Sequence, residues 1–360
     1  MTETGVRLVN DSLVVNLGAE YTVLSTVSGF TKSRYIVFHS VDEDFNVCNV
    51  DEYRRGVVTR LGLPGETPVF LTAVEPGDYI ALRADNVTVI ATVGLRPPVC
   101  VEQEGFYDPP VPGTINVAVV VEKPSLSMSA LVDLLRVAVE AKTIAASLLL
   151  LRCRGRAAGT VTDAIAVAAK VEPQGLPWAG MATRLGNKVA RLVYEAVLRG
   201  DKRNLREKLR DVLGLGPEEL LDDMLRMYMQ APVPGVDAEK ARKLLEEMLG
   251  IALRDPNVWA FLVAARELDL HGVAGTLPGI SREEFLGDSR RIIADEALAS
   301  VLAVYIAGFR GLLSTYWVDR SKHRAGLRLT KLPVFEDDAA AALVGALLSR
   351  LYDRLLSTSI

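Results

Sequence analysis

The chain has 360 residues, a length that favours two domains over one. Its hydrophobic fraction of 49% and charged fraction of 24% are those of an ordinary soluble globular protein, while a net charge of −4 and 6% aromatic residues argue against nucleic-acid binding. The three cysteines lie far apart with no CxxC pair, so neither a zinc knuckle nor a disulfide framework is expected. No secretory leader pattern opens the chain, and a cytoplasmic location is therefore expected.

Up to about residue 123 the hydrophobic pattern has mostly a period of two, which is typical of β-strands. Turn residues at Asn10-Asp11 and Asp85-Asn86 predict two hairpins. Helical patterns cover residues 51–61, 129–151 and 181–198. Residues 1–200 are therefore predicted to form a layered α/β domain, within an α+β fold class.

The composition changes at residues 199–210, RGDKRNLREKLR, a charge run where we place the domain boundary. Beyond it, helix-start signals such as Pro217 and the capping box of Ser281 with Glu284 recur. Long helices are predicted over 289–309 and 337–356, so residues 201–360 are expected to form an all-α domain. The most apolar stretch, residues 297–309, is shorter than the roughly 20 residues that a spanning helix needs, and no membrane span is expected.

Several common catalytic signatures are absent from the sequence. It contains neither GxGxxG nor GxxxxGK[ST], and it has no GxSxG. The histidines His39, His271 and His323 are not spaced as metal ligands on one helix. A hydrolase built on this chain would have to use Ser, Thr, Asp, Glu, Lys or Asn side chains.

Polar residues at the ends of predicted strands are the first candidates for a site. In the segment VPGTIN, Thr114 and Asn116 lie two residues apart and so share one face of the strand. A Pro-Gly turn, in which both side chains bind the local backbone, is the favoured interpretation. In GTVTD, Thr160, Thr162 and Asp163 precede an apolar strand. A turn that binds backbone amides and a functional site are equally supported there.

Lys142 is the least well explained charge in the long helix predicted at 129–151. Asp133, Arg136 and Glu140 share a face at helical spacing, so an ion-pair ladder accounts for them. Lys142 lies about 200° around the helix from Glu140 and is surrounded by apolar residues in VEAKTIAASLLLL. A solvated position explains it poorly.

The N-terminal segments PGTIN, VEAKTIAASLLL, GTVTDAIAVA and WAGMATRLGNKVARLVYEAVL occur in the order found in adenosylcobinamide amidohydrolases, archaeal cobamide-salvage enzymes. Residues 20–198 resemble this family, with a departure at Gly29-Phe30, where a Gly-Gly pair is common. The resemblance implies cleavage of the aminopropanol amide of adenosylcobinamide, without a firmly implied cofactor. By position it implies a site of Thr114, Asn116, Lys142, Thr160, Thr162 and Asp163, with His39 and Asn116 contacting the substrate.

Amide hydrolysis requires an activated nucleophile and donors for the developing oxyanion. One hypothesis is a threonine hydroxyl activated by Lys142 or oriented by Asp163. The competing hypothesis is a water molecule activated directly by Asp163.

The C-terminal region carries carboxylates on otherwise apolar helices. Helix capping explains Asp337-Asp338, but not Asp295-Glu296, which the predicted helix places in its middle. Several acids on facing helices suit Mg²⁺, and a nearby Lys322 could hold a phosphate.

Residues 205–356 resemble archaeal α-ribazole-5′-phosphate phosphatases, relatives of phosphatidylglycerophosphatase A, through ADEALA, VDRSK and FEDDAAAALVGAL. The resemblance implies that Lys322 binds the phosphate and that the metal ligands are Asp295, Glu296, Asp319, Asp337 and Asp338. The sequence differs from the family at His323, where proline is usual. A lipid phosphatase is the alternative for this region.

Together the two resemblances imply a bifunctional cobamide-salvage enzyme acting on adenosylcobinamide and α-ribazole-5′-phosphate, with Mg²⁺ in its second domain. A homo-oligomer is compatible with the sequence. A corrinoid-binding scaffold with one inactive domain is the alternative from a different functional class.

Overall fold

The computed structural model describes residues 4–42, 45, 47, 49–102 and 113–357. The chain divides into two compact units, Met1–Lys202 and Arg203–Ile360. The described part of the first unit is a mixed sheet with helices, and the described part of the second is helical. This agrees with the predicted α+β composition followed by helices.

The first unit is organised around an eight-stranded sheet of order β4-β3-β2-β10-β8-β6-β5, with β1 paired to β2. The strands are β1 (Gly5–Val9), β2 (Ser12–Ser25), β3 (Gly29–Ser40), β4 (Val69–Thr72), β5 (Ile80–Ala84), β6 (Val87–Val93), β8 (Ile115–Leu126) and β10 (Ala164–Val171). The expected hairpins β1–β2 and β5–β6 are present. They turn at Asn10 and Asp85, two residue types that tolerate their positive φ of 49°.

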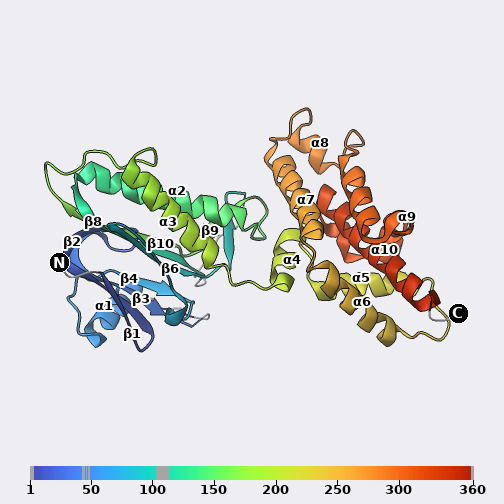
Figure 1. Cartoon of the computed structure of the whole chain (residues 1–360), viewed down its shortest axis with the longest axis horizontal. Coiled ribbons are helices and arrows are strands. Elements are labelled where there is room, and N and C mark those ends of the chain that lie inside the picture. The colour runs from blue at the N-terminus through green and yellow to red at the C-terminus, as the bar shows by residue number, and fades with distance from the viewer. Residues whose placement is uncertain (1–3, 43–44, 46, 48, 103–112, 358–360) are drawn as a thin grey trace. The chain divides into compact units, whose positions relative to one another are not determined.

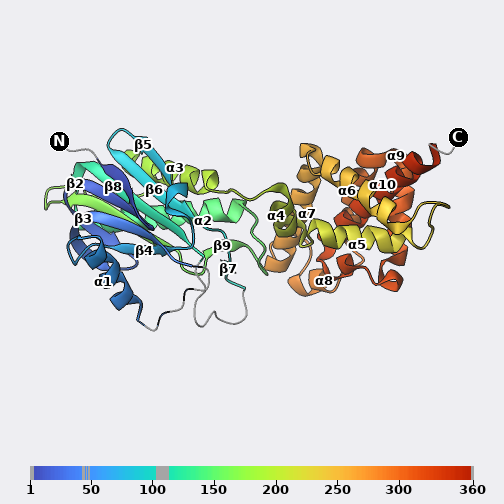
Figure 2. The same cartoon turned by 90° about the horizontal axis from the view of Figure 1, so that it is seen from below.

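The sheet curves around an inner hydrophobic cluster, because β2 pairs with β3 in two registers separated by an irregularity between Asn16 and Tyr21. Side chains from both ends of the sheet meet in this cluster, among them Phe38, Phe70 and Val120. The end of β4 thereby reaches the start of β8, although these strands are not neighbours in the sheet. The outer face carries the helices α1, α2 and α3 found in the described part of this unit (Figures 1 and 2).

Helices α1 (Val50–Arg60), α2 (Met128–Leu148) and α3 (Arg184–Arg199) match the predicted helices to within a few residues. Each begins at a polar cap, Asn49, Ser127 and Thr183, whose side chain accepts a backbone N–H. Figure 1 shows α2 and α3 side by side against β6, β8 and β10. Helix α1 packs on the β2–β3–β4 part of the outer face.

A disulfide joins Cys100 to Cys153, which corrects the expectation from cysteine spacing that no disulfide forms. The spacing rule failed because residues far apart in sequence meet in a second, two-stranded sheet of β7 (Pro98–Cys100) and β9 (Ala157–Thr160). The bond ties the segment after α2 to β7. The third cysteine, Cys48, and Pro112 of the expected Pro-Gly turn lie outside the described residues.

The second unit consists of helices α4 (Leu205–Leu213), α5 (Pro217–Tyr228), α6 (Ala238–Ala252), α7 (Pro256–Ala274), α8 (Arg282–Leu286), α9 (Ala294–Ala325) and α10 (Val334–Ser357), with short 3₁₀ turns. Helix α10 is the centre of this unit, and its residues from Ala339 to Leu348 are all buried. It packs closely along α9: a Cβ at Gly345 would lie 2.6 Å from the backbone of Thr315. Only glycine permits this approach.

Helix α9 differs from the helix predicted at 289–309 in both ends. It begins at Ala294 and continues to Ala325 across a break at Ala307-Gly308. Asp295 and Glu296 therefore lie in its first turn, not mid-helix as predicted, and favourable interaction with the helix dipole accounts for part of their placement. Among the described helices, α9 is long and apolar enough to cross a membrane by length and composition, a weak indication that core helices also give.

Candidate functional site

The Lys142 ammonium and the Asp163 carboxylate form an ion pair in the first unit. Lys142 comes from the buried face of α2, and Asp163 from the turn between β9 and β10. Their side chains are 10% and 13% exposed, so the pair is shielded from most solvent. As predicted, the ladder of Asp133, Arg136 and Glu140 accounts for the solvated face of α2, with contacts of 3.2 and 2.6 Å.

The other oxygen of Asp163 is held by donors from two strands. Its Oδ1 accepts the backbone N–H of Ile115 at 2.9 Å and that of Thr160 at 3.2 Å. The Thr160 hydroxyl also lies within hydrogen-bond distance of this oxygen and of the Gly113 carbonyl. Asp163 thus positions both Lys142 and Thr160 and joins the starts of β8 and β10.

Gly159 allows the ion pair to form beside the backbone. A Cβ at this position would lie 2.1 Å from Asp163 Oδ2 and 2.5 Å from Lys142 Nζ. Its φ of +155° also disfavours other residues. The glycine at the head of the GTVTD segment is therefore required by the cluster itself.

Thr114 and Asn116 lie on the same face, as their spacing predicted, and this is the inner face of the sheet. Thr114 Oγ1 donates to Thr72 Oγ1 at 2.9 Å, and Asn116 Nδ2 donates to the Leu71 carbonyl at 2.8 Å. Within the described part of the chain, Asn116 Oδ1 is buried without a hydrogen-bond partner. So is the hydroxyl of Thr92, the residue opposite Asn116 in the β6–β8 register.

Sequence reasoning missed Thr72 and Thr92, both of which are completely buried. The only signal was a threonine on the apolar face of a strand pattern, and the register that sets Thr92 beside Asn116 was not predictable. Unpaired buried polar atoms are costly, roughly 1–3 kcal/mol each, so they mark a place where a polar group from a ligand or water would be stabilised.

The remaining predicted site residues of the first unit are Thr162 and His39, which lie in different places. Thr162 is partly exposed, and its hydroxyl lies 3.3 Å from both the N–H and the carbonyl of Gly113. His39 does not contact the Lys142–Asp163 pair; it shares the outer face of β3 with Val37, and its ring binds Ser12 and Tyr53. The structure therefore brings Lys142, Thr160, Thr162 and Asp163 together around Gly113. The side chains of Thr114 and Asn116 bind the end of β4 instead, and His39 lies apart from both groups.

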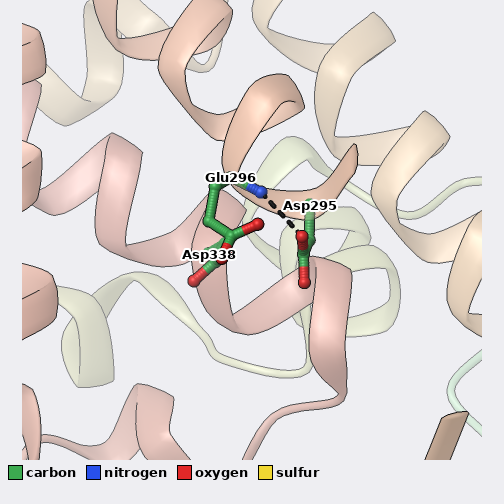
Figure 3. Close-up of side chains that lie close together, drawn as sticks. All are labelled: Asp295, Glu296 and Asp338. Carbon is green, nitrogen blue, oxygen red and sulfur yellow. Dashed lines mark hydrogen bonds between the residues drawn. The ribbon is translucent and has the colours of Figure 1, made fainter. Parts of the chain in front are cut away.

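In the second unit, Asp295, Glu296 and Asp338 form a carboxylate cluster (Figure 3). One oxygen from each lies within 4.8 Å of the others. The hydrogen bond with Asp295, followed by burial, raises the pKa of Glu296 to about 7, and burial raises the pKa of Asp338 to about 7. A divalent cation would relieve this crowding of acids, and oxygen donors of this kind fit Mg²⁺.

Lys322 lies beside this cluster and binds the remaining predicted acids. Its Nζ lies 2.7 Å from Asp319, 2.5 Å from Asp337 and 3.5 Å from Asp338. Burial opposes its charge, but Asp337 and Asp319 outweigh burial and raise the pKa of Lys322. Asp338 belongs to the carboxylate cluster and also contacts Lys322, so it links the cluster to the lysine. Asp319 and Asp337 bind Lys322 and do not belong to the cluster, and all six residues predicted in this region are thereby connected.

A model of the adenosylcobinamide amidohydrolase family matches residues 2–208, more than half of the chain. The chain belongs to the adenosylcobinamide amidohydrolase family. The match includes every residue of the Lys142–Asp163 site, and membership of the family makes the first unit a hydrolase in cobamide salvage.

Two members of the adenosylcobinamide amidohydrolase family show the extent of the similarity. The enzyme of Halobacterium salinarum is 31% identical over 191 residues, covering 50% of this chain and 79% of its own length. That of Methanosarcina mazei is 30% identical over 186 residues, covering 49% of this chain and 85% of its own length. An uncharacterized protein of Methanocaldococcus jannaschii is 29% identical over 118 residues, 32% of this chain and 90% of its own length.

Among solved structures, the low temperature requirement C protein from Listeria monocytogenes aligns with 42% of this chain and 94% of its own, at 23% identity and a TM-score of 0.35. Protein ypjQ from Bacillus subtilis aligns with 43% of this chain and 96% of its own, at 19% identity and a TM-score of 0.35.

Proposed function

We propose that the first unit hydrolyses the amide that joins aminopropanol to the corrinoid in adenosylcobinamide, giving adenosylcobyric acid and free aminopropanol. Two successive contacts support this proposal: the Thr160 hydroxyl contacts Asp163 Oδ1, and Asp163 Oδ2 contacts Lys142. A nucleophile, a base within hydrogen-bond reach and a third group that orients the base form the arrangement used in covalent hydrolysis. Family membership supports the choice of substrate.

In this mechanism Thr160 Oγ1 attacks the amide carbonyl, and its proton passes to Asp163. Lys142 keeps Asp163 in place, and its positive charge stabilises the negative charge that develops near the pair. The C–N bond breaks as the leaving amine takes up a proton, which leaves an ester on Thr160. Water then hydrolyses the ester to the carboxylic acid and restores the hydroxyl.

The test separates a threonine nucleophile from water activated by Asp163. The purified full chain is incubated with adenosylcobinamide, and both products are measured by mass spectrometry. Thr160→Val should abolish hydrolysis, whereas Thr160→Ser, which keeps a hydroxyl, should retain part of it. Hydrolysis by Thr160→Val at the wild-type rate would exclude the threonine mechanism, and the absence of both products from the wild type would exclude the proposed reaction.

We propose further that the second unit is a Mg²⁺-dependent phosphatase for α-ribazole-5′-phosphate. The observation that favours it is the carboxylate cluster of Asp295, Glu296 and Asp338 next to Lys322. These three acids would hold the cation, which would polarise the phosphate and help to activate water. Lys322, held by Asp319 and Asp337, would bind a phosphate oxygen.

Release of inorganic phosphate from α-ribazole-5′-phosphate tests this second proposal. Activity should require Mg²⁺, stop with a chelator and fall at least 100-fold in Asp338→Asn, because removing one group that binds the reacting centre typically costs that much. Glu239→Gln, an exposed acid in the first turn of α6, is the matched control. Phosphate release from a phosphatidylglycerophosphate alone would favour the lipid alternative, and corrinoid binding without turnover by either unit would favour a scaffold.

A further inference from the structure

A polar cavity of about 480 Å³ lies on the outer face of the first unit, between the β1–β2 hairpin, the end of β3 and the last turns of α1. The lining residues that bear on its chemistry are Asp11, Ser12, His39, Tyr53, Arg60 and Glu75. Its volume lies within the range of pockets that enclose small organic ligands. None of these residues takes part in the Lys142–Asp163 cluster.

The inner wall of the cavity is a hydrogen-bonded row of three side chains. Ser12 Oγ lies 2.8 Å from His39 Nδ1, and His39 Nε2 lies 3.1 Å from the Tyr53 hydroxyl. Ser12 and His39 are 2% and 8% exposed, so the row is fixed in the protein and not free at the surface. Burial, followed by the charge of Arg60, lowers the pKa of His39 and keeps its ring neutral at neutral pH.

The rim of the cavity combines carboxylates with planar groups. Asp11 and Glu75 are both exposed, and nothing in the described part of the chain forms an ion pair or side-chain hydrogen bond with either carboxylate. The guanidinium of Arg60 lies over the ring of Tyr53 at 5.8 Å. Carboxylates bind the hydroxyls of a ribose, and purine rings stack on aromatic or guanidinium planes. This set of groups fits an uncharged nucleoside better than an anion, because the three lining acids Asp11, Asp42 and Glu75 outweigh the single arginine.

Neighbouring strand ends connect this cavity to the start of β8, where the backbone N–H of Ile115 binds Asp163. His39 is followed by Ser40, which lies opposite Thr72 in the β3–β4 register. Thr72 in turn accepts the hydroxyl of Thr114 on the inner face. A large substrate could therefore contact both places at once, with its reacting amide at the cluster and another group in the cavity.

We infer that this cavity binds the adenosyl group of the corrinoid substrate, with Asp11 and Glu75 accepting the ribose hydroxyls and the adenine lying against Tyr53 and Arg60. This inference rests on the proposed amidohydrolase function and adds to it the part of the substrate that the cavity recognises. His39, hydrogen-bonded to both neighbours, holds Tyr53 and Ser12 in position and takes no part in bond cleavage.

Binding of 5′-deoxyadenosine to the full chain, measured by calorimetry, tests the inference without any catalysis. The wild type should bind it, and Glu75→Gln and Asp11→Asn should each weaken binding roughly tenfold, about 1.4 kcal/mol. Asp51→Asn, an exposed acid on α1 that does not line the cavity, should bind as the wild type does. No binding by the wild type, or equal binding by all variants, would overturn the inference.

Steady-state hydrolysis of adenosylcobinamide provides the second measurement. Glu75→Gln and Asp11→Asn should raise KM about tenfold while kcat stays unchanged, because these residues bind a remote part of the substrate. An unchanged KM in both variants, with the wild type active, would refute the cavity assignment and leave the amidohydrolase proposal standing. An inactive wild type that still binds 5′-deoxyadenosine would refute the proposed reaction and retain the nucleoside site.

Discussion

Lys142 and Asp163 are 21 residues apart in sequence, yet each supplies the other's charge partner in a site that is almost closed to solvent. A buried charge without its partner is strongly unfavourable, about 3–5 kcal/mol when one member of a pair is removed. The pair therefore fixes the end of α2 against the start of β10 and also orients Asp163 toward Thr160. Stability and the proposed chemistry depend on the same contact.

Replacing Lys142 with Met should reduce adenosylcobinamide hydrolysis at least 100-fold, because both the orientation of Asp163 and the nearby positive charge are lost. The thermal unfolding temperature should also fall, because Asp163 keeps its buried charge. Lys188→Met is the matched control: Lys188 pairs with Asp85 at the surface, where solvent screens an ion pair and its contribution to stability is small. Equal activity in Lys142→Met and Lys188→Met would contradict the proposed role.

Gly159→Ala should inactivate the first unit without adding or removing any charge. The new methyl group would lie 2.1 Å from Asp163 Oδ2, so the carboxylate or the backbone must move. We expect a loss of hydrolysis of at least tenfold, which corresponds to a modest displacement of reacting groups. Gly65→Ala, at a position with nothing within 4 Å, should keep full activity. Full activity in both variants would show that the geometry at Gly159 is unimportant.

The sequence predicted most secondary structure of the first unit because its signals are local. Caps at Ser127 and Thr183 and the turn at Asn10-Asp11 act within a few residues. The grouping of Lys142, Thr160 and Asp163 became predictable only through the resemblance to a family. The unpaired hydroxyl of Thr92 and the hydrogen-bonded row of Ser12, His39 and Tyr53 depend on strand register and on the curvature of the sheet. Local sequence patterns predict neither of these.

In the second unit, the sequence predicted which residues form the proposed site but not where their helix begins. The acids of the proposed metal site were all identified from sequence, but the start of α9 was placed too early. Asp295 and Glu296 were consequently assigned to mid-helix, when they occupy its first turn. The break at Gly308, with φ of +62°, was also missed, since a glycine within an apolar helical pattern does not by itself predict a kink.

The disulfide between Cys100 and Cys153 should stabilise the first unit by about 2–4 kcal/mol, since it closes a segment of 53 residues and restricts the unfolded chain. Thiol labelling of the denatured, unreduced protein should detect one of the three cysteines, and all three after reduction. Cys153→Ser should lower the unfolding temperature, and a reductant should lower that of the wild type but not that of the variant. Three reactive thiols before reduction would contradict the bond.

His39 should make the first unit less stable in mild acid. Burial, followed by Arg60, lowers the pKa of His39 below its ordinary 6.5, against a smaller opposing effect of Asp11. Below pH 6.5 the unfolded chain therefore takes up a proton that the folded chain does not, and the free energy of unfolding falls as the pH falls toward the lowered value. Between pH 7 and 8 both states are mostly unprotonated and this contribution is constant.

The variant His39→Gln separates this effect from general acid sensitivity. At pH 8 it should be less stable than the wild type, because the hydrogen bonds from the ring to Ser12 and Tyr53 are altered, a loss of about 1–3 kcal/mol. As the pH falls from 7 to 5, the wild type should lose stability that the variant cannot lose, and the difference between their unfolding temperatures should shrink. A difference that stays constant or widens over this range would mean that the pKa of His39 is not lowered in the folded protein.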